Sequence, residues 1–186
     1  MYFSQFPTTK FQDVTLLDIT RKAQLDKLVE SNALAYMNYT VQEGEKPEDV
    51  AFYYYDDPSY AWLVLSSNNI VDPYSHWPKD MTSFEEYLKV EYATASGTTG
   101  DAVIEWTKNA TIGANIVHYQ SFQDPEIRLN RASYLNASDQ ERKEFYPVRV
   151  YDYEFELNEQ RREIVLVNKS LLPSIQNQLE RVLNGS

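Results

Sequence analysis

Cysteine is absent from this 186-residue chain, and histidine occurs only twice. Without thiols the chain forms no disulfides, performs no thiolate chemistry and builds no cysteine-based zinc site. His76 and His118 lie far apart in the sequence and in no metal-ligand spacing, so both are interpreted as structural histidines. The sequence therefore predicts neither a metal site nor a cofactor.

Long apolar runs and clusters of positive charge are also missing. No window approaches the roughly 18 apolar residues that a membrane-spanning helix needs. The segment 1–7 lacks the basic and apolar regions of a signal peptide. The formal net charge of −11 opposes binding to nucleic acid or to an anionic membrane surface, because both require clustered Lys and Arg. We therefore expect a protein that folds in a cytoplasm and has neither nucleic acid nor membrane as a partner.

Motifs that support catalysis are scarce as well. The Gly97–Gly100 stretch lacks the following Lys-Ser or Lys-Thr of a phosphate-binding loop, and no Gly-x-Ser-x-Gly elbow occurs. Carboxylates are paired at 56–57 and at 85–86, but adjacent side chains diverge, and a glycosidase needs two carboxylates that face each other. The sequence predicts that the protein is not an enzyme.

Aromatic residues, in contrast, are abundant, with 15 Tyr, 8 Phe and 3 Trp. Tyrosine combines a large contact area with a hydroxyl group that tolerates water, so it suits surfaces that become interfaces. The alternative is that many of these rings close a small core. Seven residues of the N-terminal arm and of a loop stiffened by two prolines are candidate partner-binding residues: Phe3, Phe6, Phe11, Asp72, Tyr74, His76 and Trp77. Tyr74 is the better candidate for exposure, whereas Trp77 either anchors a partner or folds back onto its own helices.

The clearest local signals lie between residues 36 and 78. Alternating apolar and polar residues around Tyr39 and Val41 predict a strand, and Gly44 permits a turn. Pro47 fits a first helical turn, and Asp56-Asp57-Pro58 ends that helix and caps the next. The second helix is predicted over 59–67, followed by a left-handed stop at 68–69 and an extended exit loop at 72–78.

The remaining elements give an α+β fold. We expect three ranges: an N-terminal arm and helix at 1–35, a central module with its following helix at 36–94, and a C-terminal α+β region at 95–186. The boundary at 95 follows from a Gly- and Ser-containing hinge at 95–100. The predicted elements outside the module are helices at 22–34, 83–92 and 170–183, a strand at 116–122, a long loop with short helices at 123–144, and a hairpin of strands 151–157 and 164–167. The helix at 83–92 is expected to begin with a capping box formed by Thr82 or Ser83 with Glu85 or Glu86.

These residues resemble the baseplate wedge subunit with a LysM-like domain that is found in contractile-tailed phages of the T-even type. The resemblance rests on Asp18-Ile-Thr-Arg21, Tyr39-x-Val41, Gly44-Glu45-x-Pro47-Glu48, Ala51, Asp57-Pro58-x-Tyr60-x-Trp62-Leu-Val-Leu65, Asn68-Asn-x-x-Asp72-Pro-Tyr74-x-x-Trp77 and, more weakly, Asn158-Glu159. It implies that residues 36–78 form a small LysM-like βαα module. The sequence departs from glycan-binding LysM modules at one point. Those modules close with a second strand soon after the second helix, whereas here a new helix is predicted to follow.

The resemblance implies a structural role in the virion. Family members complete the baseplate wedge and join neighbouring wedges into a six-fold ring around the tail hub. The expected partners are the large wedge scaffold protein, the small wedge subunit related to tail lysozyme-like proteins and the hub, with six copies of this chain per baseplate, assembled in the host cytoplasm. Two alternatives stay open: a peptidoglycan-binding LysM-type module that acts at the host cell wall, and a cell-wall hydrolase.

Overall fold

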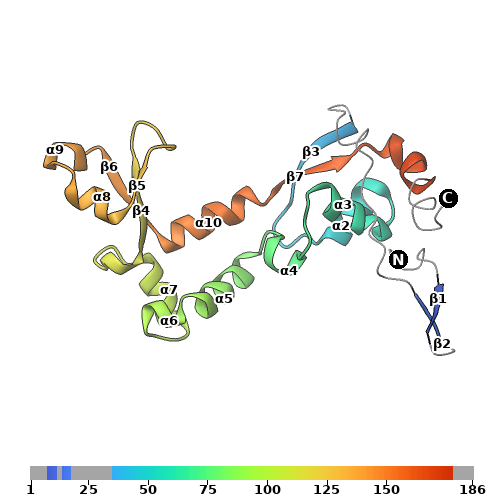
Figure 1. Cartoon of the computed structure of the whole chain (residues 1–186), viewed down its shortest axis with the longest axis horizontal. Coiled ribbons are helices and arrows are strands. Elements are labelled where there is room, and N and C mark those ends of the chain that lie inside the picture. The colour runs from blue at the N-terminus through green and yellow to red at the C-terminus, as the bar shows by residue number, and fades with distance from the viewer. Residues whose placement is uncertain (1–7, 12–13, 18–34, 178–186) are drawn as a thin grey trace. The chain divides into compact units, whose positions relative to one another are not determined.

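The computed structural model describes residues 8–11, 14–17 and 35–177, and it mixes helices with short antiparallel strands (Figure 1). The predicted α+β class is confirmed. Contacts divide the chain into unit 1, residues 1–78 with 161–186, and unit 2, residues 79–160. This division differs from the predicted ranges 1–35, 36–94 and 95–186, because the chain leaves unit 1 after the central module and returns to complete it. The hinge expected at 95–100 lies inside unit 2.

Unit 1 contains two small sheets and several short helices. Its elements are β1 (Thr8–Phe11), β2 (Val14–Leu17), β3 (Tyr36–Thr40), α2 (Pro47–Tyr55), η3 (Pro58–Tyr60), α3 (Ala61–Ser67), α4 (Pro73–His76), β7 (Glu163–Val167) and η5 (Lys169–Leu171). The predicted strand, turn and two helices of the central module are therefore confirmed. The exit loop is not wholly extended as predicted: the two residues that precede prolines, Asp72 and Trp77, are extended, but Pro73–His76 between them forms the helical turn α4.

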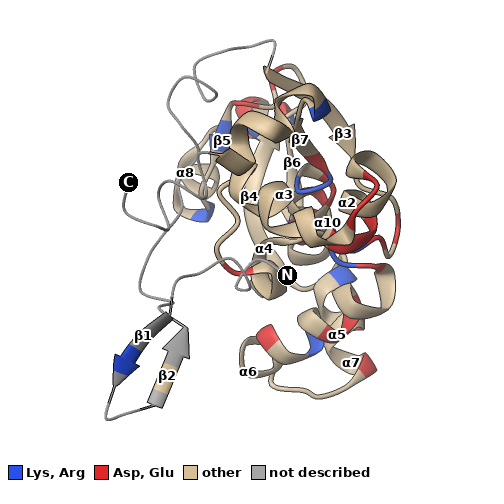
Figure 2. Ribbon diagram, turned by 90° about the vertical axis from the view of Figure 1, so that its right-hand side faces the viewer, with Lys and Arg blue, Asp and Glu red and all other residues tan. Residues whose placement is uncertain are grey.

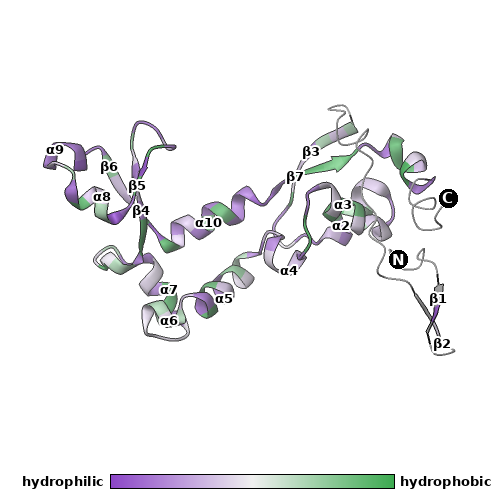
Figure 3. Cartoon of the chain, viewed as in Figure 1, coloured by the Kyte–Doolittle hydropathy of each residue, from purple (hydrophilic) through white to green (hydrophobic). Residues whose placement is uncertain are grey.

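The sheet of the central module pairs β3 with β7 in antiparallel register, so that Tyr36 faces Val167 and Thr40 faces Glu163. Strands 8–11 and 14–17 form a separate hairpin. The predicted hairpin of 164–167 with 151–157 is wrong, because β7 finds its partner in β3 instead. The pairing is favoured because β7 buries Ile164, Leu166 and Val167 in the core of unit 1, and Figure 3 shows β7 as a hydrophobic strand.

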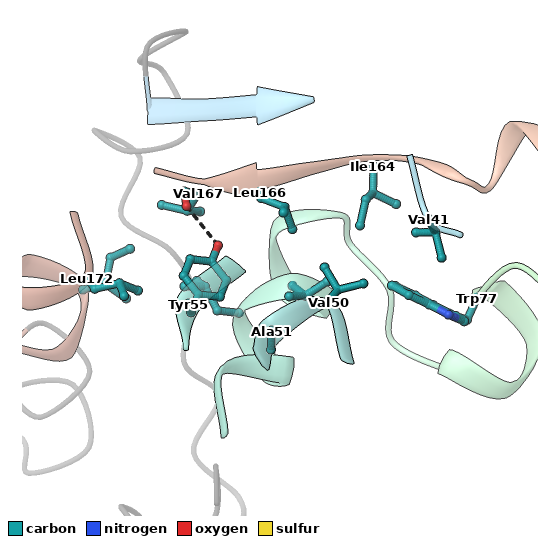
Figure 4. Close-up of a cluster of buried hydrophobic side chains, with 12 residues drawn as sticks. Val41, Val50, Ala51, Tyr55, Trp77, Ile164, Leu166, Val167 and Leu172 are labelled. Atoms are coloured by element: carbon teal, nitrogen blue, oxygen red, sulfur yellow. Dashed lines mark hydrogen bonds between the residues drawn. The ribbon is translucent and has the colours of Figure 1, made fainter. Parts of the chain in front are cut away.

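The core of unit 1 lies between this sheet and helices α2 and α3. Val50, Ala51, Leu63 and Val64 are fully buried beneath β7. Figure 4 shows Tyr55 pointing toward the end of β7, where its hydroxyl donates a hydrogen bond of 2.9 Å to the carbonyl of Val167. Burial raises the pKa of Tyr55. Helix α2 is thereby fixed to β7 by packing and by a buried polar contact.

Asn68 closes the outer edge of β7. Its side-chain amide donates to the carbonyls of Val64 and Val165, each at 2.8 Å, and its carbonyl accepts the N–H of Val165 at 2.8 Å. The side chain thus replaces one rung of a neighbouring strand on an edge that would otherwise leave backbone groups unpaired. The left-handed stop predicted here is confirmed at Asn69, whose φ is 54°.

Unit 2 combines a three-stranded sheet with helices. Its elements are α5 (Met81–Glu91), α6 (Ala93–Ser96), α7 (Asp101–Lys108), η4 (Gly113–Asn115), β4 (Ile116–Ser121), β5 (Arg128–Leu129), α8 (Arg131–Asn136), α9 (Asp139–Arg142), β6 (Phe145–Arg149) and α10 (Val150–Gln160). The strand order is β5-β4-β6, with antiparallel neighbours. The strand expected at 116–122 and the irregular stretch with short helices at 123–144 are confirmed.

Helices α5, α7 and α10 share the hydrophobic core of unit 2. Phe84 and Leu88 of α5 are buried with Ile104 of α7 and Val150 of α10. Near the last residue of unit 2, Asn158 binds both backbone groups of Lys79, the first residue of the unit. Its Oδ1 accepts the Lys79 N–H at 2.8 Å, and its Nδ2 donates to the Lys79 carbonyl at 2.9 Å. The two ends of unit 2 are therefore held together by one amide side chain.

Helix α10 occupies the segment that was predicted as a strand at 151–157. Val150, Glu154 and Asn158, spaced by four residues, are buried on one side of the helix. The rings of Tyr151 and Phe155, also four apart, both contact the ring of Phe84. The apolar residues that alternate along 151–157 are thus accommodated on a helix, because several of them are also four residues apart.

The start of one predicted helix differs in the structure, and two other predicted helices lie wholly or partly outside the described residues. Helix α5 begins at Met81, and its cap is Asp80, which accepts the N–H of Ser83 at 2.9 Å, rather than Thr82 or Ser83. The predicted final helix is present over 172–177, and the rest of it lies outside the described residues, as does the helix predicted at 22–34.

Candidate partner-binding surface

Two turns of unit 1 lie together, and they carry several of the predicted site residues. The first joins β3 to α2 over residues 42–46, and the second is α4 with its flanking residues, 72–77. We call them the paired turns. The indole N–H of Trp77 donates to the backbone carbonyl of Glu45 at 2.8 Å, so the second turn is fixed directly to the first.

The first turn is organised around one carboxylate. Gly44 adopts a φ of 74°, which a glycine tolerates without steric cost. The Glu45 carboxylate accepts the hydroxyl of Tyr39 at 2.7 Å and the backbone N–H of Gln42 at 2.9 Å. Burial, together with this hydrogen bond, raises the pKa of Tyr39 to about 12. At neutral pH Tyr39 is therefore protonated and donates to Glu45, which ties the turn to strand β3.

The second turn is capped by its own carboxylate. Asp72 accepts the hydroxyl of Ser75 at 2.6 Å and the N–H of Tyr74 at 3.0 Å. These hydrogen bonds, led by that of Ser75, hold the pKa of Asp72 below its ordinary value. His76 Nδ1 lies 3.0 Å from the backbone carbonyl of Asp72. The loop thus presents its outer side chains from a short, hydrogen-bonded helical turn.

The predicted site residues divide into exposed and buried ones. Tyr74 is 91% exposed, as expected for a contact residue, and His76 is exposed on the same turn. Trp77 is only 7% exposed and lies beside Val41 in the core of unit 1 (Figure 4). The structure therefore favours the interpretation that Trp77 folds back onto its own unit, and its ring does not reach the surface as an anchor. That Asp72, Tyr74 and His76 contact a partner stays a prediction.

The three candidate phenylalanines of the N-terminal arm lie outside the described residues or have side chains that do. Phe3 and Phe6 lie outside the described residues. Phe11 ends β1, and its side chain is likewise outside the described part. That these three residues bind a partner stays a prediction.

Glu45 is the residue of this surface that sequence reasoning missed. The Gly44-Glu45 pair predicts a turn, and nothing in that local signal indicates that the Glu45 backbone receives Trp77, 32 residues further along the chain. A buried indole N–H normally finds an acceptor, which is the one general signal that Trp77 would bind a distant carbonyl.

Within residues 8–11, 14–17 and 35–177, no group of three or more His, Asp or Glu side chains is placed to hold a metal ion. Over the same ranges, every helix is too short or too polar to span a bilayer.

Exposed aromatic and polar side chains on turns fixed by hydrogen bonds are typical of proteins that bind other macromolecules. Comparison with known families gives the particular class. The family model described as base plate wedge protein 53 matches residues 8–182, so the chain belongs to this family of structural phage baseplate proteins. The baseplate wedge protein gp53 of Enterobacteria phage T4 is 24% identical over 149 residues, covering 80% of this chain and 74% of the T4 protein. The predicted baseplate wedge family is confirmed.

Proposed function

We propose that this protein completes the baseplate wedge of a contractile phage tail and joins neighbouring wedges into a six-fold ring around the hub. The single observation that carries the proposal is the family match, which spans both units of the chain. Its partners are other baseplate components: the large wedge scaffold protein, the small tail lysozyme-like wedge subunit and the hub. Six copies per baseplate, and assembly in the host cytoplasm before incorporation into the virion, complete the proposal.

The construction of the chain supports a connecting role. Units 1 and 2 each have their own hydrophobic core, and each exposes large apolar side chains, among them Tyr53 and Tyr74 in unit 1 and Phe122 in unit 2. Two such bodies on one chain supply separate contact surfaces, which a protein that links two neighbours needs. Binding without catalysis is part of the proposal.

Unit 1 is further proposed to be a LysM-like module. Its order of strand, helix, helix and closing strand is formed by β3, α2, α3 and β7. In this interpretation unit 2 is an insertion before the closing strand, which explains why a new helix follows α3 where a LysM module ordinarily closes.

The test is assembly in the absence of the chain. A phage whose copy of the coding sequence is interrupted should accumulate separate wedges, and supply of the purified wild-type chain should restore six-fold baseplates in electron micrographs. A chain truncated before β7 is the matched negative control, because unit 1 then lacks its closing strand. Tails that assemble and contract normally without the protein would contradict the proposal.

One observation favours a second candidate, peptidoglycan binding. The paired turns, which contain Gly44 and Asp72, are fixed to each other by the hydrogen bond from Trp77 to Glu45, and a peptidoglycan-binding module would hold its glycan there. Purified cell wall should then retain the isolated chain, and substitution of Tyr74 by alanine should release it. Failure of the wild-type chain to bind cell wall would remove this candidate, and a murein zymogram without clearing would remove the hydrolase alternative.

A further inference from the structure

The outer face of helix α2 carries two aromatic rings that its own fold does not use. Pro47, Val50, Ala51 and Tyr55 occupy the inner face and are buried. On the opposite face Phe52 is 55% exposed and Tyr53 is 72% exposed, with their ring centroids 5.9 Å apart. Neither ring belongs to the core of unit 1 or to the partly buried side chains packed against it.

Each exposed ring follows a carboxylate by one helical turn. Glu48 stands four residues before Phe52, and Asp49 stands four residues before Tyr53, so each pair shares one side of the helix. Both acids are exposed, and Figure 2 shows acidic residues along α2. We define these four residues, Glu48, Asp49, Phe52 and Tyr53, as the α2 outer face.

The fold accounts for the acids but not for the rings. Acidic residues favour the N-terminal turn of a helix, and the Asp49 carboxylate also accepts the backbone N–H of Lys46 at 2.9 Å. At the other end of the helix, Asp56 is already paired with Lys169. Exposed aromatic rings, in contrast, add nothing to the capping or to the core, whereas aromatic residues are enriched where proteins bind each other.

The combination of ring and carboxylate selects a cationic partner. A guanidinium group can stack on an aromatic face while its N–H groups bind a carboxylate, and an ammonium group does the same less specifically. A second copy of this chain fits less well, because its net charge of −11 gives it a surplus of acids to bring against Glu48 and Asp49.

We infer that the α2 outer face docks an arginine- or lysine-bearing segment of another baseplate protein. This inference rests on the proposed wedge function and adds to it the surface and the chemistry of the contact. The cation lies over Phe52 or Tyr53 and pairs with the carboxylate one turn before it.

A photo-crosslinking experiment tests the inference in the assembled baseplate. The photoreactive residue p-benzoylphenylalanine replaces Phe52 in the full-length chain, baseplates are assembled and irradiated, and mass spectrometry identifies the crosslinked peptide. The same residue at Val90, which is 79% exposed on α5, is the matched control for accidental crosslinks. The expected product from position 52 is a peptide of another baseplate protein with Arg or Lys next to the crosslink. A crosslink to a second copy of this chain, a peptide without a cation, or no crosslink beyond the control would overturn the inference.

Variants give a second readout that separates this inference from the wedge function itself. The double variant Phe52→Ala, Tyr53→Ala removes only exposed rings, and its thermal unfolding should match the wild type. Its incorporation into wedges should fall about tenfold, since truncating a central interface aromatic ordinarily costs at least that much affinity. Glu48→Lys should reduce incorporation as well, and raised salt should weaken the wild-type chain more than this variant. Wild-type incorporation of the double variant would refute the inference while leaving the wedge function standing. If baseplates form normally without the chain at all, the wedge function fails instead.

Discussion

Replacing Asn68 by alanine is expected to destabilise unit 1 strongly for a half-buried polar side chain. The Asn68 side chain makes three hydrogen bonds of 2.8 Å, to the carbonyls of Val64 and Val165 and from the N–H of Val165. At a net contribution of about 1 kcal/mol for each bond, the loss is about 3 kcal/mol. The penalty is not larger because Asn68 and Val165 are only partly buried, so water can reach some of the released groups.

The magnitude is measurable in two ways. Urea unfolding followed by circular dichroism should show the midpoint of unit 1 shifted to lower denaturant. Hydrogen exchange at the amide of Val165 gives the local view, since that N–H loses its acceptor, and a change of about 3 kcal/mol corresponds to exchange roughly a hundredfold faster. Asn38→Ala on strand β3 is the matched control, because that asparagine side chain is exposed and its loss should be nearly neutral.

A variant that keeps part of the contact sharpens the test. Asn68→Asp retains an acceptor for the N–H of Val165 but turns a second oxygen toward the carbonyls of Val64 and Val165. At neutral pH it should therefore unfold about as easily as the alanine variant. If Asn68→Ala remained within about 0.5 kcal/mol of the wild type, the idea that this side chain serves as the missing strand of β7 would be refuted.

Three further predictions concern other polar contacts. Trp77→Phe should cost about 2 kcal/mol, because the hydrogen bond to Glu45 and part of the ring volume are lost, and an unchanged urea midpoint would count against the coupling of the paired turns. Asn158→Ala should cost unit 2 about 2 kcal/mol and speed exchange of the Lys79 amide, and protection equal to the wild type would show that the ends of the unit are held otherwise. The pKa of Asp80 is lowered below its ordinary value of 3.8 by the N–H of Ser83, so its stabilisation is present above that value and is lost as the pH falls through the lowered pKa. The melting temperatures of wild type and Asp80→Ala should therefore differ at neutral pH and converge in strong acid, and a gap that persists in acid would exclude the charged cap as its cause.

The central module could be predicted from the sequence because its signals are local. Gly44 marks a turn, Pro47 starts α2, and Asp57 caps the next helix through the N–H of Ser59 at 2.8 Å. Each of these residues acts on neighbours within a few positions. Local propensity and local structure agree here, which is the condition under which sequence reasoning succeeds.

The partner of β7 could not be predicted in the same way. Thr40 and Glu163, whose side chains hydrogen bond across the sheet, are 123 residues apart. A strand carries no local mark that identifies its partner, so the nearest alternating segment, 151–157, was the natural but incorrect choice. That segment alternates in hydrophobicity and also has apolar and aromatic residues four apart, and only the contacts of Tyr151 and Phe155 with Phe84 decide between strand and helix.

In the candidate surface, too, the features set by neighbouring residues could be predicted and those set by distant residues could not. Exposure of Tyr74 follows from its place on a short turn bounded by prolines, which the sequence displays. Burial of Trp77 depends on an acceptor, the Glu45 carbonyl, and on a core that includes β7, neither of which is adjacent to it in the chain. Sequence reasoning could therefore propose the loop as a contact region but could not decide which of its two aromatic rings, Tyr74 or Trp77, is exposed.

Strand β7 follows unit 2 in the chain, so unit 1 is completed only by residues that come after residue 160. Unit 1 buries Ile164, Leu166 and Val167 from β7, so residues 36–78 lack a large part of their core until the chain has passed through 79–160. Bringing distant strands together costs loop-closure entropy, and that cost falls when the intervening segment keeps its own ends close. Asn158 does this for unit 2 by binding both backbone groups of Lys79. Loss of the contact between Asn158 and Lys79 is therefore expected to raise the loop-closure cost of pairing β7 with β3.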